Sequence, residues 1–196
     1  MKKQRYKHSL ILFVLIIFIA GLPACKQKYT PKSRGYFRID LPKHEYQTLD
    51  SFFPYGFEYS KIAKIQKDKD DPSQKLWINI HYPKYNGTIH LSYIAVNNNL
   101  AQLLEDARKL AYKHTIKAES IEEQQFTNPQ NKVHGILYHI KGNTASSVQF
   151  VATDSSSHFL RGALYFMNHP NQDSLAPVIK YIDHDIKHIM ETLTWK

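Results

Sequence analysis

The chain contains a single cysteine, Cys25, so no disulfide can stabilise the fold and an apolar core must suffice. It has only seven glycines in 196 residues. They form neither a phosphate-binding loop nor a dinucleotide fingerprint, and the sequence contains no Gly-x-Ser-x-Gly elbow. These absences remove the sequence support for nucleotide chemistry and for serine hydrolysis. We therefore expect a protein that is not an enzyme and that holds no cofactor.

A long apolar run is missing as well. The longest stretch, from Leu10 to Ala20, has eleven apolar residues, whereas a helix that crosses a bilayer needs about 20. Four basic residues and no acidic residue precede it. A basic start, a short apolar core and small residues after it are typical of a secretory signal. We predict a signal peptide over residues 1–24.

The cysteine stands directly after this signal. The residues Leu22-Pro23-Ala24-Cys25 resemble the lipobox of bacterial lipoproteins, although Pro23 departs from the usual small or β-branched residue. In such proteins the thiol carries a diacylglyceryl group, the signal is cut before the cysteine, and the new amine is often acylated with a chain such as palmitate. Two or more acyl chains hold a protein firmly to a membrane. The alternative is an ordinary signal peptide whose cysteine is lost or left free.

The next residues, 25–34, have no apolar run, and Pro31 favours an extended chain. We interpret them as a tether of at most about 30 Å, which keeps a single domain over residues 35–196 close to its own membrane. Loss of the signal lowers the formal net charge from +9 to +5. This mild excess favours anionic lipid head groups or an acidic partner, and not nucleic acid.

A first strand is expected over residues 36–41, ended by Pro42. Its basic and aromatic side chains, together with the preceding arginine, suggest a contact patch for lipid or a partner, formed by Arg34, Tyr36 and Arg38. The alternative is a solvated strand face.

Alternating apolar and polar residues predict most of the remaining fold as short strands. We expect them over residues 57–59, 75–82, 88–96, 132–141, 145–153 and 158–166, with a charged loop over 67–73 and an extended segment within 116–126.

Two helices complete the prediction. The first runs from Leu100 to about Thr115 after a cap supplied by the asparagines at 97–99. The second begins at Asp173 or Ser174 and buries an apolar face made of Leu175, Val178, Ile179, Ile182, Ile186, Ile189, Met190 and Leu193. Because hairpins link most strands, we predict an α+β fold with helices packed on an antiparallel sheet.

Eleven histidines raise the question of a metal site. The best spacing is that of His184, His188 and Glu191 on the final helix. This face lies opposite the apolar stripe, so we interpret it as a solvated face and predict no metal site. His81 and His90, on neighbouring strands, are expected to fill a packing or surface role.

The serines are the other candidates for chemistry. They are Ser146, Ser147 and Ser155–Ser157, with Asp154 and His158 nearby. A serine-rich tip between two strands is typical of a hairpin turn, and we interpret residues 154–157 so.

Four stretches of the chain resemble the family of the gliding-motility lipoprotein GldD. They are YTPKSRGYFRIDLP (29–42), KLAYKHTIKAESI (109–121), GNTASSVQFVATDSSSHFLRGALYF (142–166) and VIKYIDHDIKHIMETLTW (178–195). The similarity covers nearly the whole mature chain and includes Cys25, and Ser33 stands where we expect the family to have a proline. The strand order and the long final helix also resemble the PsbP/Mog1 type of α+β sandwich.

The resemblance implies a membrane-anchored lipoprotein of the cell envelope, facing the periplasm and needed for gliding. It implies work beside other motility lipoproteins and the type IX secretion machinery, with no small-molecule substrate. The family has no catalytic residues to carry over, so only Cys25 transfers as a site. The alternative is a lipoprotein that binds a glycan or lipid between the sheet and the helices, which a deep pocket lined by tyrosine and tryptophan would favour.

Overall fold

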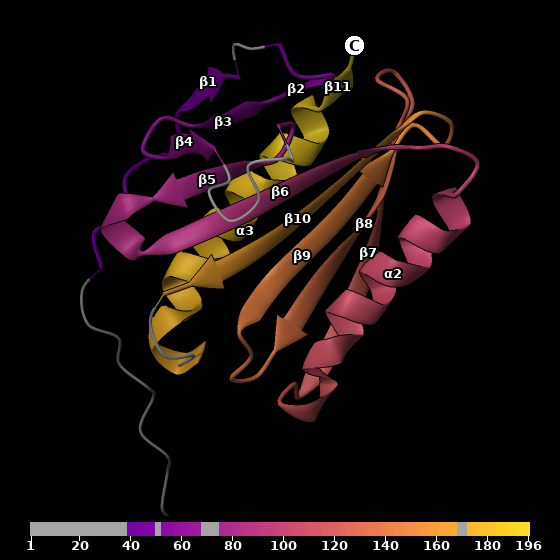
Figure 1. The fold of residues 1–196 in the computed structure, drawn as a ribbon. Coiled ribbons are helices and arrows are strands. Elements are labelled where there is room, and N and C mark those ends of the chain that lie inside the picture. Colours follow the sequence, from indigo (N-terminus) through magenta and orange to yellow (C-terminus); the bar gives the residue numbers. More distant parts are fainter. Residues whose placement is uncertain (1–38, 50–51, 68–74, 168–171) are drawn as a thin grey trace, which may run out of the picture. The chain divides into compact units, whose positions relative to one another are not determined.

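The computed structural model describes residues 39–49, 52–67, 75–167 and 172–196 (Figure 1). In this part of the chain one antiparallel sheet has seven strands. In order across the sheet they are β4 (Lys64–Lys67), β5 (Ile78–Tyr82), β6 (Gly87–Ala95), β10 (His158–Phe166), β9 (Ser146–Thr153), β8 (Val133–Lys141) and β7 (Ser120–Asn128).

The hairpins predicted from the alternating residues are confirmed. In the first, β5 and β6 pair so that Ile80 lies opposite Ile89, after a turn through the 3-10 helix η1 (Pro83–Tyr85). Farther along the chain, β8, β9 and β10 form an antiparallel meander, with one register shift between Leu164 and Tyr165 of β10. The long-range pairing of β6 with β10 joins the two parts into one sheet.

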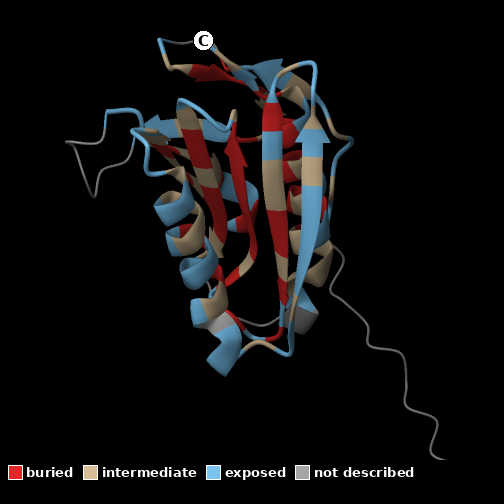
Figure 2. Cartoon of the chain, turned by 90° about the vertical axis from the view of Figure 1, so that its right-hand side faces the viewer, coloured by how far each residue is buried: buried red, intermediate tan, exposed pale blue. Residues whose placement is uncertain are grey.

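The two helices cover opposite faces of this sheet (Figures 1 and 2). α3 (Gln172–Thr192) lies over the larger core, where Ile80, Ile89 and Phe150 are completely buried. α2 (Leu100–Tyr112) covers a smaller core that includes Val151 and Phe159. A strand presents alternate residues to opposite faces, so each core takes every second side chain. Burial of each large apolar side chain contributes about 1.5–3 kcal/mol. The predicted α+β class is therefore confirmed.

Most of the apolar face predicted for α3 is fully buried, and Leu175 and Ile179 are partly buried. The predicted start was wrong, because the helix begins at Gln172 and both proposed cap residues lie in its first turn. For α2, Asn99 occupies the predicted cap position but makes no side-chain cap. Its Oδ1 accepts a hydrogen bond from the backbone N–H of Asn97 instead, at 2.8 Å.

α2 ends at Tyr112, a few residues before the predicted end, and continues into the 3-10 helix η2 (Lys113–Ile116). The extended segment expected within 116–126 is confirmed as part of β7. Neither α2 nor α3, the helices in the described part of the chain, is both long and apolar enough to span a bilayer.

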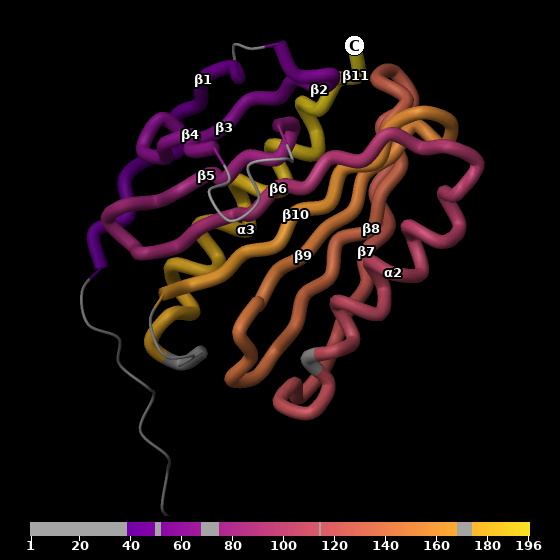
Figure 3. The backbone as a smooth tube through the Cα atoms, in the orientation of Figure 1, coloured from indigo at the N-terminus to yellow at the C-terminus, as the bar shows by residue number. Residues whose placement is uncertain are grey.

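The strand expected over residues 36–41 is not found in its described part. Residues 39–45 have no strand, and the first strand is β1 (Tyr46–Thr48), which pairs with β3 (Glu58–Ser60). Ile39 and Leu41 do pack against the larger core, so their alternation reflects burial without a neighbouring strand. Figure 3 shows the tube of residues 39–49, in indigo, rising past β5 to β1. A second small sheet joins β2 (Tyr55–Gly56) to β11 (Thr194–Trp195).

Candidate functional site

A buried carboxylate interrupts the apolar face of α3. Asp185 is fully buried. Its Oδ2 accepts a hydrogen bond from the Tyr82 hydroxyl at 3.0 Å. Its Oδ1 accepts from the Tyr46 hydroxyl at 3.1 Å and lies 2.7 Å from Nδ1 of His44. A carboxylate inside an apolar core is tolerated only when such bonds replace its water. Burial, reinforced by the Asp185 charge, raises the pKa of both tyrosine hydroxyls, so they stay protonated donors.

These bonds fasten residues 39–48, which we call the N-terminal strap, onto α3. The His44 ring stacks on Tyr181 and on His184, each with ring centroids 4.2 Å apart. At the other end of the strap, Lys84 pairs with the Asp40 carboxylate at 2.8 Å, and the Tyr85 hydroxyl donates to the Asp40 carbonyl at 2.9 Å. The strap is thus held to the domain at two places.

The face of α3 expected to be solvated is only partly so. His184 and Glu191 are exposed, as predicted. His188 is not, because the Tyr46 ring stacks on it at 3.6 Å and its Nε2 lies 2.8 Å from the Glu58 carboxylate. The prediction was wrong at this residue because β1 and β3, far away in the sequence, lie against that side of the helix.

The candidate metal ligands brought together are His44, His184 and Asp185, whose ligand atoms lie within 4.8 Å of one another. The two imidazole rings are stacked, with 22° between their planes. The in-plane lone pairs of stacked rings run side by side, whereas a tetrahedral ion needs them to converge. Both Asp185 oxygens also already accept hydrogen bonds. The cluster is therefore built as a hydrogen-bonded clamp.

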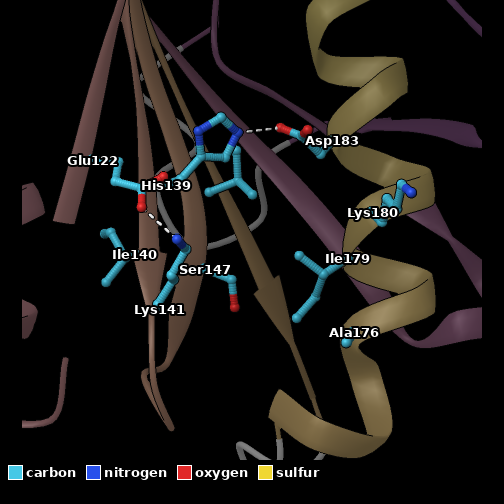
Figure 4. Close-up of a pocket in the computed structure, with 10 residues that line it drawn as sticks. Glu122, His139, Ile140, Lys141, Ser147, Ala176, Ile179, Lys180 and Asp183 are labelled. Carbon is cyan, nitrogen blue, oxygen red and sulfur yellow. Dashed lines mark hydrogen bonds and ion pairs between the residues drawn. The ribbon is translucent and has the colours of Figure 1, made fainter. Parts of the chain in front are cut away.

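A pocket of about 360 Å³ opens between the N-terminal half of α3 and the strands β7 to β9 (Figure 4). Val148, Ala176 and Ile179 supply apolar lining, and Figure 4 shows Ile179 pointing from α3 toward the strands. The charged lining residues are Glu122, His139, Lys141, Lys180 and Asp183. The pocket thus combines an aliphatic interior with a charged rim.

Most charges on this rim are paired. His139 Nε2 and Lys187 Nζ lie 2.8 Å and 2.7 Å from the Asp183 carboxylate, and Lys141 pairs with Glu122. Burial alone would raise the pKa of Asp183, but the hydrogen bonds from its two partners outweigh it and lower the pKa. Among the described residues, Lys180 forms no ion pair, which leaves one exposed cation at the rim.

The serine-rich stretch between β9 and β10 is the predicted hairpin turn. The Asp154 carboxylate accepts the backbone N–H groups of Ser156, Ser157 and His158 at 3.0, 2.8 and 2.8 Å. Burial raises the pKa of Asp154, but these backbone donors lower it more, to well below its ordinary value. The His158 ring contacts the Tyr93 hydroxyl instead, with Nδ1 at 2.8 Å. The carboxylate therefore organises the turn.

Asp154→Ala is expected to lower the free energy of unfolding by about 1–2 kcal/mol at neutral pH, because three backbone donors lose their acceptor on a partly screened surface. The folded pKa lies below the ordinary value of 3.8. The stabilisation is therefore present above that value and is lost as the pH falls toward the folded pKa. Urea denaturation of both proteins at pH 7 and pH 3 measures this. An equal difference at the two pH values would contradict it, and Asp106→Ala on exposed α2 is the control.

The remaining residues singled out in the sequence fall into two groups, one outside the described residues and one on β5 and β6. Cys25, Arg34, Tyr36 and Arg38 lie outside the described residues. His81 and His90 are not directly opposed, because their cross-strand partners are Thr88 and Asn79. His81 Nδ1 lies 3.0 Å from the Thr88 hydroxyl, and His90 packs edge-on against Tyr165, so the predicted packing role is confirmed.

Comparison with known proteins identifies the chain. The model of the family described as gliding motility lipoprotein GldD matches residues 26–195. The chain belongs to the GldD family. The match begins at residue 26, directly after Cys25, which is the first residue of the predicted mature chain. Membership in the GldD family makes the protein a membrane-anchored lipoprotein of the envelope that is involved in gliding motility.

The other comparisons add little about function. A search of curated proteins found no match. Among solved structures, cyanobacterial PsbP (CyanoP) from Synechocystis sp. PCC 6803 is similar at 10% identity and a TM-score of 0.47. That alignment covers 82% of this chain and 98% of the PsbP chain. The α+β class of this GldD family member follows from its own sheet and helices.

Proposed function

We propose that the protein is a non-catalytic accessory or scaffold subunit of the motility apparatus and its type IX secretion machinery, anchored through Cys25 and facing the periplasm. The observation that carries the proposal is the clamp of the N-terminal strap onto α3. The strap follows the lipidated cysteine and tether in the sequence, so any load on the anchor enters the domain through it.

The clamp suits that load. His44 and Tyr46 are bonded to a fully buried carboxylate on the longest described helix, whose apolar face belongs to the larger core. Pulling on the strap therefore loads the contacts of Asp40 first and then the clamp on Asp185, which connects the strap to the larger core. Anchor and domain then act as one mechanical unit, which is what a scaffold at a membrane requires.

The experiment tests the non-catalytic part of the proposal in gliding cells that carry the variant as their only copy. His139→Gln, Asp183→Asn and Ser147→Ala remove the titratable and nucleophilic groups of the pocket while keeping similar volumes. We expect cells with each variant to spread at a rate within about twofold of the wild type, because the proposed role uses the surface of the domain and not the chemistry of the pocket. Loss of spreading by a variant that remains folded and membrane-bound would reject a purely structural role.

The pocket favours a second candidate function, the binding of a hydrocarbon chain. Its volume of about 360 Å³ falls within the range of small-ligand sites. None of the described residues that line it is tyrosine or tryptophan, the residues expected for sugar stacking. An aliphatic interior beside the free charge of Lys180 suits a fatty acyl chain with an anionic head, so a lipid fits better than a glycan.

Ala176→Phe, which fills the pocket, is expected to weaken binding of a fluorescent fatty acid at least about tenfold by displacing the chain from its apolar contacts. Fluorescence titration of the purified protein measures it. The matched control is Ala101→Phe on the exposed side of α2, which should leave the affinity unchanged. Equal affinities for both variants would place the ligand elsewhere and remove this candidate.

A further inference from the structure

The two edges of the main sheet, as far as the structure describes it, are built very differently. At one edge, β4 has four residues, and Lys64 and Lys67 are two of them. Short length and lysines are devices that stop an edge from pairing with another chain. At the other edge, β7 has nine residues and contains neither lysine, proline nor glycine. It pairs with β8 without a bulge from Ser120↔Lys141 to Asn128↔Val133.

The outer side of β7 is open. Figure 2 looks onto this edge, and no described element lies in front of the strand. Six of its nine residues are exposed, and the other three are partly buried. In an antiparallel strand every second residue points its N–H and C=O away from its neighbour. The main chain of β7 therefore offers a row of donors and acceptors to an incoming strand.

The side chains along this edge specify what would pair there. Glu122 and Glu123 are consecutive, so they lie on opposite faces of the sheet. Lys141 pairs with Glu122, and the Tyr112 hydroxyl donates to Glu123, but both glutamates remain exposed. The hydrogen bond and charge of Lys141 lower the pKa of Glu122, which stays ionised. Ile121 and Phe126, partly buried, frame the pair.

We propose that β7 binds an extended segment of a partner protein by strand addition, and that this segment carries two consecutive basic residues. The two basic residues of the partner lie opposite Glu122 and Glu123, and apolar residues of the partner lie opposite Ile121 and Phe126. The partner strand adds antiparallel, as every pair in this sheet does, so its pattern read from the N-terminus is apolar, any, any, basic, basic, apolar. Main-chain bonds supply affinity and the charged pairs supply register. The inference rests on the proposed scaffold role and names the partner's chemistry.

The test uses the full lipidated chain in detergent and a short fluorescent peptide containing Val-Thr-Ser-Lys-Lys-Val. Fluorescence anisotropy should detect saturable binding, and replacing both lysines of the peptide with glutamate should weaken it about tenfold or more. The double variant Glu122→Lys/Glu123→Lys should weaken binding of the lysine peptide similarly. Asp106→Lys/Glu191→Lys makes the same charge change at exposed residues outside β7 and should not.

Two further peptides separate strand addition from simple charge attraction. Each is N-methylated at alternate residues. In one peptide the methyl groups lie along one edge of the strand it would form, and in the other peptide they lie along the opposite edge. We expect one to lose binding and the other to keep it, because only one edge faces β7. Equal binding of both, no saturable binding, or equal binding of the glutamate peptide would overturn the proposal.

The protein could instead dimerise through this edge. Dimerisation that is abolished by Glu122→Lys/Glu123→Lys would assign the edge to a second copy and would also overturn the proposal. Gliding that requires the membrane-bound domain but tolerates this double variant would reject the surface and leave the scaffold role standing.

Discussion

Asp185→Ala is expected to lower the free energy of unfolding by about 3–5 kcal/mol, because it removes the acceptor at the centre of a buried network. Three donors, from His44, Tyr46 and Tyr82, would then lie against α3 without their carboxylate. Leaving a buried donor unpaired costs about 1–3 kcal/mol. A domain of this size is typically stable by only about 5–15 kcal/mol, so the loss would be a large part of the total.

Chemical denaturation of the full chain measures this loss, and Asp185→Asn supplies a milder variant in case the alanine protein does not fold. The asparagine keeps one oxygen as an acceptor and should retain part of the stability. Asp106→Ala, exposed on α2, should change stability by less than about 0.5 kcal/mol. Amide exchange over the N-terminal strap should quicken in the Asp185 variants. A loss below about 1 kcal/mol for Asp185→Ala would show that the clamp is not an important contact.

Cys25→Ala is expected to move the protein from the membrane to the soluble fraction. Each buried methylene of an acyl chain contributes about 0.8 kcal/mol to membrane binding, so loss of the predicted diacylglyceryl and amide-linked chains should remove the anchor. In the described part of the chain no helix can replace it. Gliding should be lost as well, because a released domain no longer holds its position at the membrane.

Fractionation and mass spectrometry of the native protein test this directly. A second variant joins a cleavable secretory signal directly to residue 26, so that its release does not depend on cleavage before residue 25. That variant should be soluble in the periplasm, whereas Ser33→Ala, in the tether, should remain membrane-bound. An unmodified thiol in the native protein, or normal gliding by the soluble variant, would reject the anchoring role.

The sequence predicted the elements of the fold well where each element's own residues carry the signal. Ile78, Ile80 and Tyr82 alternate with polar residues, and all three are buried on one face of β5. β1 escaped prediction, because a three-residue strand with no buried residue has too short a pattern. Pro42 was interpreted as the end of a strand, whereas Ile39 and Leu41 pack on the core without one.

The clamp was missed although the sequence held a clue to it. Asp185 lies three residues after Ile182 and four before Ile189, so it falls inside the apolar stripe of α3. A carboxylate in that position has to find donors or remain unpaired. The pattern shows the problem, but it cannot say which side chains solve it.

By itself the sequence determined the types of most elements and the family, because these depend on neighbouring residues and on long similar stretches; the signal and its cysteine stay predictions. Only the tertiary structure decided that His44 meets Asp185, 141 positions away, that His188 is covered, and that β7 is left as a long open edge. Contacts of this kind arise when the chain packs as a whole. Local periodicity fixes which side of an element is buried, but packing selects what lies against it.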